Sequence, residues 1–309
     1  MEVLKSLGAR IAPVSETANF LEVRGVMLTS LIDRKDRERI VEALNRVVFE
    51  HRVVVFRNQG VVAGSDQVAI SRWFNPLEST FYKHPMSPHP DVFRVSNDST
   101  VGCTGVGRTG WHVDGSFQPS PFSHALYHII ECPTKGATAF LPLEEFLDGL
   151  EPGYRRKLEA LSMLSDRRSM HAKPVVYSHP KTGKKTMCFH LGMIRAFVTS
   201  DGRIMGREET AQELDELEKA IVQSGLIYTH NWQVGDFIIS DNCAVAHEAT
   251  PETQWPVEEV GLRVRTVLRR SPLPRSFAGP PSLSLALRAS LTRHYQVMHR
   301  TTTQGWVGR

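Results

Sequence analysis

The sequence predicts a mainly β protein with flanking helices, folded as a double-stranded β-helix, or jelly roll. Short runs rich in β-branched or alternating apolar residues recur along the 309-residue chain, and glycine, proline or asparagine separates them. This alternation of short strands and turns favours a jelly roll over a doubly wound sheet. A single domain over residues 1–274 is expected, followed by a C-terminal extension over residues 275–309.

The elements of the first half follow from hydrophobic spacing. Residues 1–32 are expected to form short strands and turns. A helix is expected from Asp33 to His51, because apolar residues recur there at the spacing of one helix face: Ile40, Ala43, Leu44, Val47 and Val48. Residues 53–56 predict a buried strand, residues 65–74 a second helix, and residues 92–96 a short strand within a loop-rich region.

The second half contains more strands. They are expected at residues 125–131, 137–140, 227–232, 236–240, 245–248 and 262–269. Residues 175–177 and 186–189 predict a hairpin with a polar turn, whereas residues 143–164, broken near Pro152, and residues 208–224 predict helices. The extension has apolar residues at helical spacing and is expected either to dock on the body or to mediate self-association, which makes a homo-oligomer one expected outcome.

Composition excludes several classes of protein. The chain is 41% hydrophobic with a net charge of +4, and it has neither zinc-finger spacing nor a basic stripe, so no nucleic-acid partner is expected. Its four cysteines form no C-x-x-C pair, which argues against a disulfide framework or a thiolate zinc site. The first residues have no apolar signal region, and no run of about 18 apolar residues occurs in the chain. A cytoplasmic protein with no membrane span is therefore expected.

Two candidate metal ligands stand between Gly110 and Phe117. In an extended segment His112 and Asp114 point to the same side, as two members of the 2-His-1-carboxylate set of non-heme iron oxygenases do. The alternative is a surface pair or a satisfied core histidine. Among the thirteen histidines, His247 is the best third ligand, because it follows a strand and an Asp-Asn turn; the alternative is a hydrogen-bonded loop histidine.

Arginines on the last expected strand offer a site for an anion. Three ligands leave coordination positions open for O₂ and an organic cosubstrate; if that cosubstrate is 2-oxoglutarate, its distal carboxylate needs a buried cation. Arg263, Arg265 and Arg269 share one face of the strand over residues 262–269. Because an unpaired buried charge is costly, an anionic ligand is inferred; the alternative is a solvated arginine face.

Several motifs in order resemble one family. Over residues 5–272 the chain resembles the taurine/2-oxoglutarate dioxygenase (TauD/TfdA-like) family of Fe(II)-dependent oxygenases. The resemblance rests on residues 40–59, on Trp111-His112-x-Asp114-x-Ser116-Phe117, on Gly136-Ala137-Thr138-x-Phe140, on His179-Pro180-x-Thr182-Gly183 and on the block from Trp232 to His247. Ordered motifs of this kind are far more specific than any one of them alone.

The resemblance assigns roles to individual residues. It implies that His112, Asp114 and His247 bind iron, and that Thr138 and Arg265 hold 2-oxoglutarate, with Arg263 as the alternative cation. Arg269 matches a position that meets the substrate anion, and His84 and Asn97 match positions near the same pocket. The segment at Gly136 is one residue shorter than the family pattern, and the extension after Pro274 has no counterpart.

The function expected from this resemblance is an Fe(II)- and 2-oxoglutarate-dependent dioxygenase. It would use O₂ to hydroxylate a small, anionic organic substrate, with release of succinate and CO₂. Asp114 argues against halogenation, since halogenating relatives lack that carboxylate. Two alternatives are desaturation or cyclisation of a natural-product or amino-acid intermediate, and a zinc-dependent hydrolase-like jelly roll.

Overall fold

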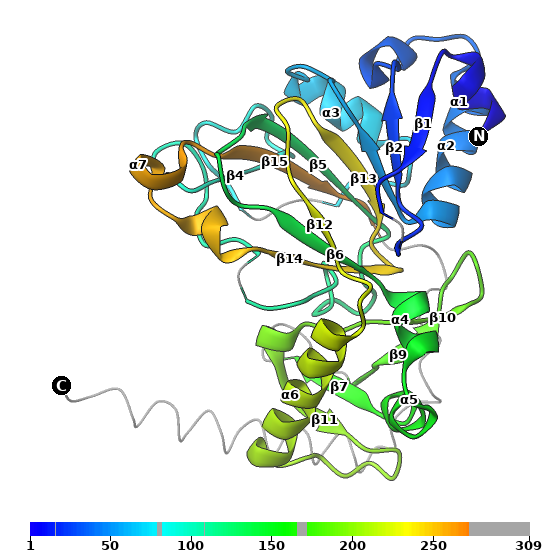
Figure 1. Cartoon of the computed structure of the whole chain (residues 1–309), viewed down its shortest axis with the longest axis vertical. Coiled ribbons are helices and arrows are strands. Elements are labelled where there is room, and N and C mark those ends of the chain that lie inside the picture. Colours follow the sequence, from blue (N-terminus) through cyan, green and yellow to red (C-terminus); the bar gives the residue numbers. More distant parts are fainter. Residues whose placement is uncertain (16, 79–81, 108, 166–171, 272–309) are drawn as a thin grey trace.

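The computed structural model describes residues 1–15, 17–78, 82–107, 109–165 and 172–271, and a seven-stranded sheet forms its largest layer (Figure 1). In spatial order the strands are β1 (Arg10–Pro13), β2 (Leu21–Arg24), β3 (Val53–Phe56), β13 (Phe237–Asp241), β5 (His124–Glu131), β15 (Val264–Arg269) and β4 (Phe93–Ser96). Neighbouring strands are antiparallel except β2 and β3, which are parallel. We call this the major sheet.

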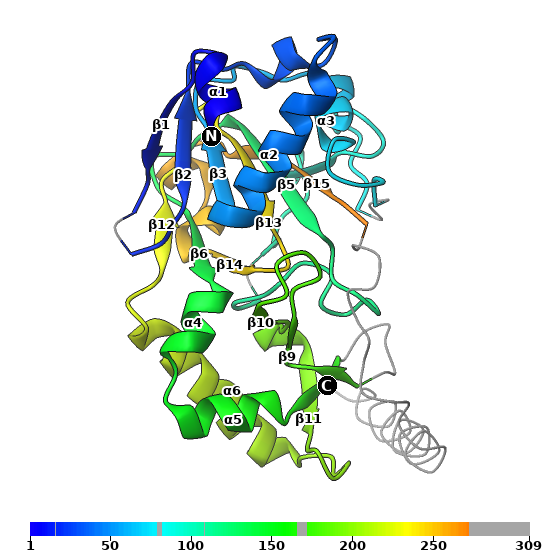
Figure 2. The same cartoon turned by 90° about the vertical axis from the view of Figure 1, so that its right-hand side faces the viewer.

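The two faces of the major sheet are buried against different partners. Because side chains alternate along a strand, Val54 and Phe56 of β3 face α2 (Arg37–His51) and α3 (Gly64–Ser71), whereas Val53 and Val55 face the opposite side. Figure 2 shows α2 and α3 on the outer side of the sheet. Burial on both faces explains why β3 is an uninterrupted apolar run.

A smaller sheet closes the jelly roll. It contains β12 (Tyr228–His230), β6 (Thr138–Pro142) and β14 (Val245–Ala249), in that order. Phe140 and Val245 of this minor sheet pack in the same core cluster as Val53 and Val55 of the major sheet. The two sheets therefore enclose a shared apolar core, which confirms the predicted double-stranded β-helix.

A third group of elements lies beside the minor sheet (Figure 1). It comprises the helices α4 (Leu143–Gly149), α5 (Pro152–Glu159) and α6 (Arg207–Gln223), the sheet β11 (Ile194–Val198), β7 (Ser162–Ser165) and β8 (Lys173–Pro174), and the hairpin of β9 (Val176–Ser178) and β10 (Lys185–Met187). Short helices complete the described chain: α1 (Glu2–Ser6), η1 (Leu28–Leu31), η2 (Leu191–Met193), η3 (Pro251–Gln254) and α7 (Val257–Val260).

Most predicted elements are confirmed within a few residues, but two predictions are wrong. Residues 1–32, expected as short strands and turns, also contain the helices α1 and η1. The helix expected over residues 143–164 breaks before Pro152 as predicted, yet it ends at Glu159, and residues 162–165 form β7 instead. Strand pairing with β11, which the sequence did not predict, fixes this segment as extended. The extension over residues 275–309 lies outside the described residues. In the described chain, no helix has the length and hydropathy needed to span a membrane.

Candidate metal and cosubstrate site

Backbone pairing brings the two candidate histidine ligands together. His112 lies opposite His247 in an antiparallel bridge that extends the minor sheet. The His112 N–H donates to the His247 carbonyl at 3.1 Å, and the His247 N–H donates in return at 2.9 Å. Directly opposed residues project their side chains to the same face of a sheet, so the two imidazoles lie 4.3 Å apart, centroid to centroid.

Asp114 completes a compact set of buried ligands. Its carboxylate oxygens lie 3.9 Å from His112 Nε2 and 3.9 Å from His247 Nε2. One ligand atom from each of the three residues falls within 4.8 Å of the others. His112 Nδ1 lies 2.8 Å from the Gly110 carbonyl, which can only accept, so the proton sits on Nδ1 and the Nε2 lone pair faces the cluster. This donor set fits a divalent iron ion.

The electrostatics of the cluster favour the forms that bind a cation. Burial, the largest cause, lowers the pKa values of His112 and His247, so both rings are neutral near pH 7. Burial would raise the pKa of Asp114, but the Arg269 cation and the two histidines more than offset it, and the net pKa lies well below its usual range. Neutral imidazoles and an ionised carboxylate are the ligand forms that a metal needs.

Arg269 connects the carboxylate to the wall of the cavity. Its Nε and Nη2 donate to the two Asp114 oxygens at 2.8 and 3.0 Å, a bidentate geometry. Its guanidinium lies between the rings of Phe93 and Phe122, 5.7 and 5.9 Å from their centroids. Arg269 is thereby held at the cavity surface, where one cation can meet both Asp114 and a bound anion.

Arg265 is a second buried cation in the same cavity. Its Nη1 donates to Thr138 Oγ1 at 3.4 Å, and its guanidinium lies 4.9 Å from the Tyr127 ring centroid. Trp232 Nε1 also donates to the Thr138 oxygen, at 3.1 Å. Within the described residues Arg265 has no acidic partner and its Nε makes no hydrogen bond. Burial lowers the pKa of Arg265; a carboxylate from outside the chain would satisfy this charge.

A cavity of about 280 Å³ brings the predicted ligands and cations together. Its lining includes the six residues His112, Asp114, Thr138, His247, Arg265 and Arg269. The rest of the wall carries several aromatic and apolar side chains, among them Tyr82, Phe93, Phe117, Phe122 and Met193. A volume of this size suits a small organic molecule rather than a polymer.

Three of the predicted residues do not line this cavity. Asn97 clamps a loop instead: its side chain donates to the carbonyls of Trp255 and Gly261 and accepts from the Arg263 N–H. His84 bonds the Ser99 carbonyl at 3.1 Å. Arg263 is buried and directly precedes β15; its N–H donates to Asn97 Oδ1 at 2.9 Å, and its side chain does not line the cavity.

His190 lines the cavity although the sequence did not single it out. Its ring stacks on His112 at 4.7 Å, and its Nε2 lies 3.3 Å from Thr109 Oγ1. The backbone of His112 pairs with His190 on one side and with His247 on the other. This pairing joins segments far apart in the chain, so no local pattern marks His190 as a cavity residue. Its position just after the predicted hairpin was the only indication in the sequence.

A jelly roll with two histidines and a carboxylate in one cavity is typical of non-heme iron oxygenases. Residues 11–271 match the model of the family described as taurine catabolism dioxygenase TauD, TfdA family. The chain belongs to this family.

Characterised relatives and a solved structure are consistent with that membership. The chain is 28% identical over 243 residues to an alpha-ketoglutarate-dependent 2,4-dichlorophenoxyacetate dioxygenase of Cupriavidus pinatubonensis, covering 67% of this chain and 82% of the relative. It is 27% identical to an alpha-ketoglutarate-dependent sulfonate dioxygenase of Saccharomyces cerevisiae, covering 79% and 63%. A taurine dioxygenase from Burkholderia xenovorans has the same fold, with a TM-score of 0.69, 20% identity and coverage of 92% and 98%.

Family membership confirms the predicted class of enzyme. The protein is an oxidoreductase of the Fe(II)- and 2-oxoglutarate-dependent dioxygenase class, which acts on small molecules with O₂. The zinc-dependent hydrolase alternative receives no support from these relatives.

Proposed function

We propose that this enzyme hydroxylates a small organic anion that carries an apolar or aromatic body. The convergence of His112, Asp114 and His247 with two buried arginines in one cavity carries the proposal. His112, Asp114 and His247 would hold Fe(II) at the wall of this cavity. When bound, iron and 2-oxoglutarate supply the oxidising chemistry, with succinate and CO₂ as co-products.

Arg265 and Thr138 bind the distal carboxylate of 2-oxoglutarate in this proposal. The Arg265 guanidinium, which has no acidic partner among the described residues, offers a planar fork to a carboxylate, and the Thr138 hydroxyl adds one further hydrogen bond. Tyr127 and Trp232 flank Arg265 and keep water from it. Arg263 lies outside the cavity lining, which favours Arg265 over Arg263 for this role.

Arg269 binds the anionic group of the substrate. It is the cavity cation nearest to Asp114, at 2.8 Å, so an anion bound there is held beside the metal ligands. Tyr82 and Phe93, stacked at 4.5 Å, and Phe122 supply an aromatic wall for the remainder of the molecule. The named activities of the two relatives, on a phenoxyacetate and on sulfonates, match an anion attached to an organic body.

Succinate release with Fe(II), O₂ and 2-oxoglutarate tests this proposal. The panel contains phenoxyalkanoates, alkyl sulfonates and amino acids, and mass spectrometry separates hydroxylation, a gain of one oxygen, from desaturation or cyclisation, a loss of two hydrogens. On the best substrate, Arg269→Ala should lower kcat/KM by about 100-fold, because the charge-assisted contact with the substrate anion is lost. Substrate-free decarboxylation of 2-oxoglutarate should fall much less, and equal loss of both activities rejects substrate binding by Arg269.

The cellular setting belongs to the same proposal. A cytoplasmic location agrees with four cysteines that are all unpaired in the structure. Sedimentation of the full chain decides whether it self-associates.

A further inference from the structure

The turn between β13 and β14 touches the backbone of Asp114. The Asn242 side chain, 1% exposed, accepts the Asp114 N–H through Oδ1 at 3.0 Å. Its Nδ2 donates to the carbonyls of Asp114 and Phe122 at 2.9 and 2.7 Å. One side-chain amide therefore pairs with both polar backbone groups of Asp114, as a neighbouring strand would.

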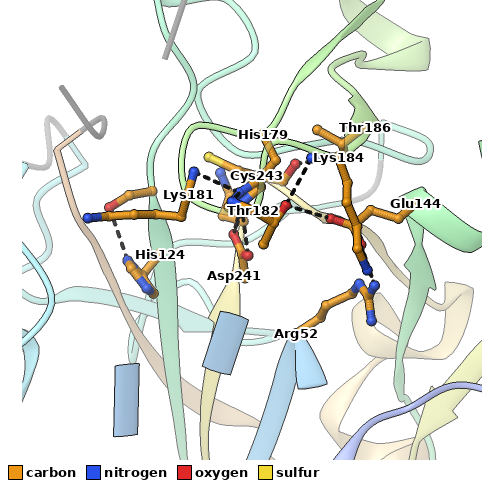
Figure 3. Close-up of polar contacts among 12 residues, drawn as sticks. Arg52, His124, Glu144, His179, Lys181, Thr182, Lys184, Thr186, Asp241 and Cys243 are labelled. Atoms are coloured by element: carbon orange, nitrogen blue, oxygen red, sulfur yellow. Dashed lines mark hydrogen bonds and ion pairs between the residues drawn. The ribbon is translucent and has the colours of Figure 1, made fainter. Parts of the chain in front are cut away.

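The same turn is held in place by a buried histidine. His179 and Asp241 point toward each other in Figure 3, with His179 Nε2 and Asp241 Oδ2 2.9 Å apart, and both side chains are fully buried. His179 Nδ1 accepts the backbone N–H groups of Lys181 and Thr182 at 3.1 Å each. The proton must therefore lie on Nε2, from which it is donated to Asp241.

This trio of His179, Asp241 and Cys243 does not suit a metal ion, although its ligand atoms are close together. Both nitrogens of His179 are already used, and Asp241 Oδ1 also accepts the Cys243 N–H at 3.0 Å. The Asp241 N–H donates to the Arg52 carbonyl at 2.8 Å, which ties the turn to the end of α2. The contacts fix the conformation of the turn, and Asn242 transmits that conformation to Asp114.

We propose that Asn242 is a positioning residue for the metal site, which it serves by fixing the backbone of the ligand Asp114. His179 and Asp241 support it by fixing the turn. This inference rests on the proposed iron ligands. Loss of the Asn242 side chain would leave the buried Asp114 N–H without a described partner, and the carboxylate would no longer be held at its present distance from His112 and His247.

Binding of Mn(II), a redox-stable substitute for Fe(II), tests this role directly. Titrations followed by electron paramagnetic resonance should give an affinity at least about tenfold weaker for Asn242→Ala than for wild type. Thr186→Val is the matched control, because the buried Thr186 hydroxyl donates to the Cys243 carbonyl of the same turn at 2.9 Å but does not contact Asp114. Its affinity should stay within about threefold of wild type.

Asn242→Asp is the second variant if Asn242→Ala does not fold. It keeps an acceptor for the Asp114 N–H but cannot donate to the two carbonyls. Its affinity for Mn(II) should therefore also be at least about tenfold weaker than that of wild type. An Asn242 variant that binds Mn(II) within threefold of wild type, or a Thr186→Val protein weakened as much, overturns the positioning role while leaving the proposed function intact. Failure of wild type itself to bind Mn(II) overturns the metal site first, and this inference with it.

Discussion

At the scale of the residue, the two buried arginines at the start of β15 differ in what surrounds them. Arg265 lines the cavity beside Thr138, whereas Arg263 does not line it and none of its side-chain nitrogens has a described hydrogen-bond partner. Burial lowers the pKa of both, and most strongly that of Arg263. The nearby Arg265 cation adds to the lowering of the Arg263 pKa, and a bound dicarboxylate would offset the cost of burying the Arg265 charge.

The two arginines should respond differently to substitution. Arg265→Met removes the proposed partner of the 2-oxoglutarate carboxylate and should raise the KM for 2-oxoglutarate by about 100-fold. Arg263→Met should leave that KM within about twofold and should not reduce stability, because an apolar side chain replaces a buried charge without a partner. Decarboxylation kinetics measure the first effect and urea denaturation the second. A larger KM effect for Arg263→Met would reassign the cosubstrate cation.

At the scale of the element, the loop after Asp114 depends on a left-handed backbone. Gly115 has φ of +75°, and a Cβ there would meet the ring and the backbone nitrogen of Phe122 at 3.0 Å. Gly183, in the turn of the β9–β10 hairpin, has φ of +72° with nothing within 4 Å. The two glycines thus have the same conformational demand, but only Gly115 is also confined by packing.

Replacement of these two glycines by alanine separates strain from crowding. Gly183→Ala should cost about 1 kcal/mol of unfolding free energy, from the backbone alone. Gly115→Ala should cost at least about 2 kcal/mol and should also weaken Mn(II) binding, because Phe122 or Asp114 must move. Urea denaturation and metal titration give both quantities. Equal destabilisation by the two variants, with unchanged metal affinity, would show that the Phe122 contact accommodates a methyl group.

Individual strands differ in how well the sequence predicted them. Strands such as β3 and β13 were predicted because β-branched and apolar runs between turn residues are a local signal. β7 was missed because Ser-Met-Leu-Ser has no such signal and becomes a strand through pairing with β11, whereas β11, Ile-Arg-Ala-Phe-Val before turn residues, does have one and was not recognised. Non-local pairing of this kind leaves no period in the sequence.

The residues of the candidate site also differ in whether a local sequence pattern predicts their position. The spacing of His112 and Asp114 and the strand around Arg265 and Arg269 are local patterns, and the structure brings these four residues into one cavity. Arg263 lies just before the first residue of β15 and does not line the cavity, and where the strand starts depends on its pairing with β4 and β5 rather than on a local pattern. Positions for His84 and Asn97 were taken from resemblance across a loop-rich region, whose path depends on contacts such as those of Asn97 with residues 255–261.

At the scale of the whole molecule, buried histidines couple folding to pH. Burial, the largest cause, lowers the pKa of His124 from 6.5 to about 4. Its ring lies at 5.2 Å from Phe49 of α2 and 5.0 Å from Phe74, and its Nδ1 lies 3.1 Å from Ser123 Oγ. Four other buried histidines also have pKa values lowered by burial: His112, His128, His230 and His247.

Acid should therefore destabilise the fold before its carboxylates titrate. Between pH 6.5 and 4 the unfolded chain binds protons on these histidines that the folded chain does not, so unfolding free energy falls as pH falls. The share of His124 is about 3 kcal/mol across this window. The pKa of Asp114 is lowered in the folded protein, so its ionised carboxylate stabilises the fold at pH values above the usual pKa of an aspartate. That stabilisation is lost only as the pH falls below this value.

His124→Phe isolates this contribution, because it keeps a ring against Phe49 and Phe74 but removes the titrating group. Urea denaturation at several pH values should show a smaller loss of unfolding free energy from pH 6.5 to 4 for this variant than for wild type, by about 3 kcal/mol. The comparison between the two proteins cancels the effect of the other four histidines, which titrate in both. Parallel curves for wild type and variant would mean that the folded protein accommodates the charged His124 ring.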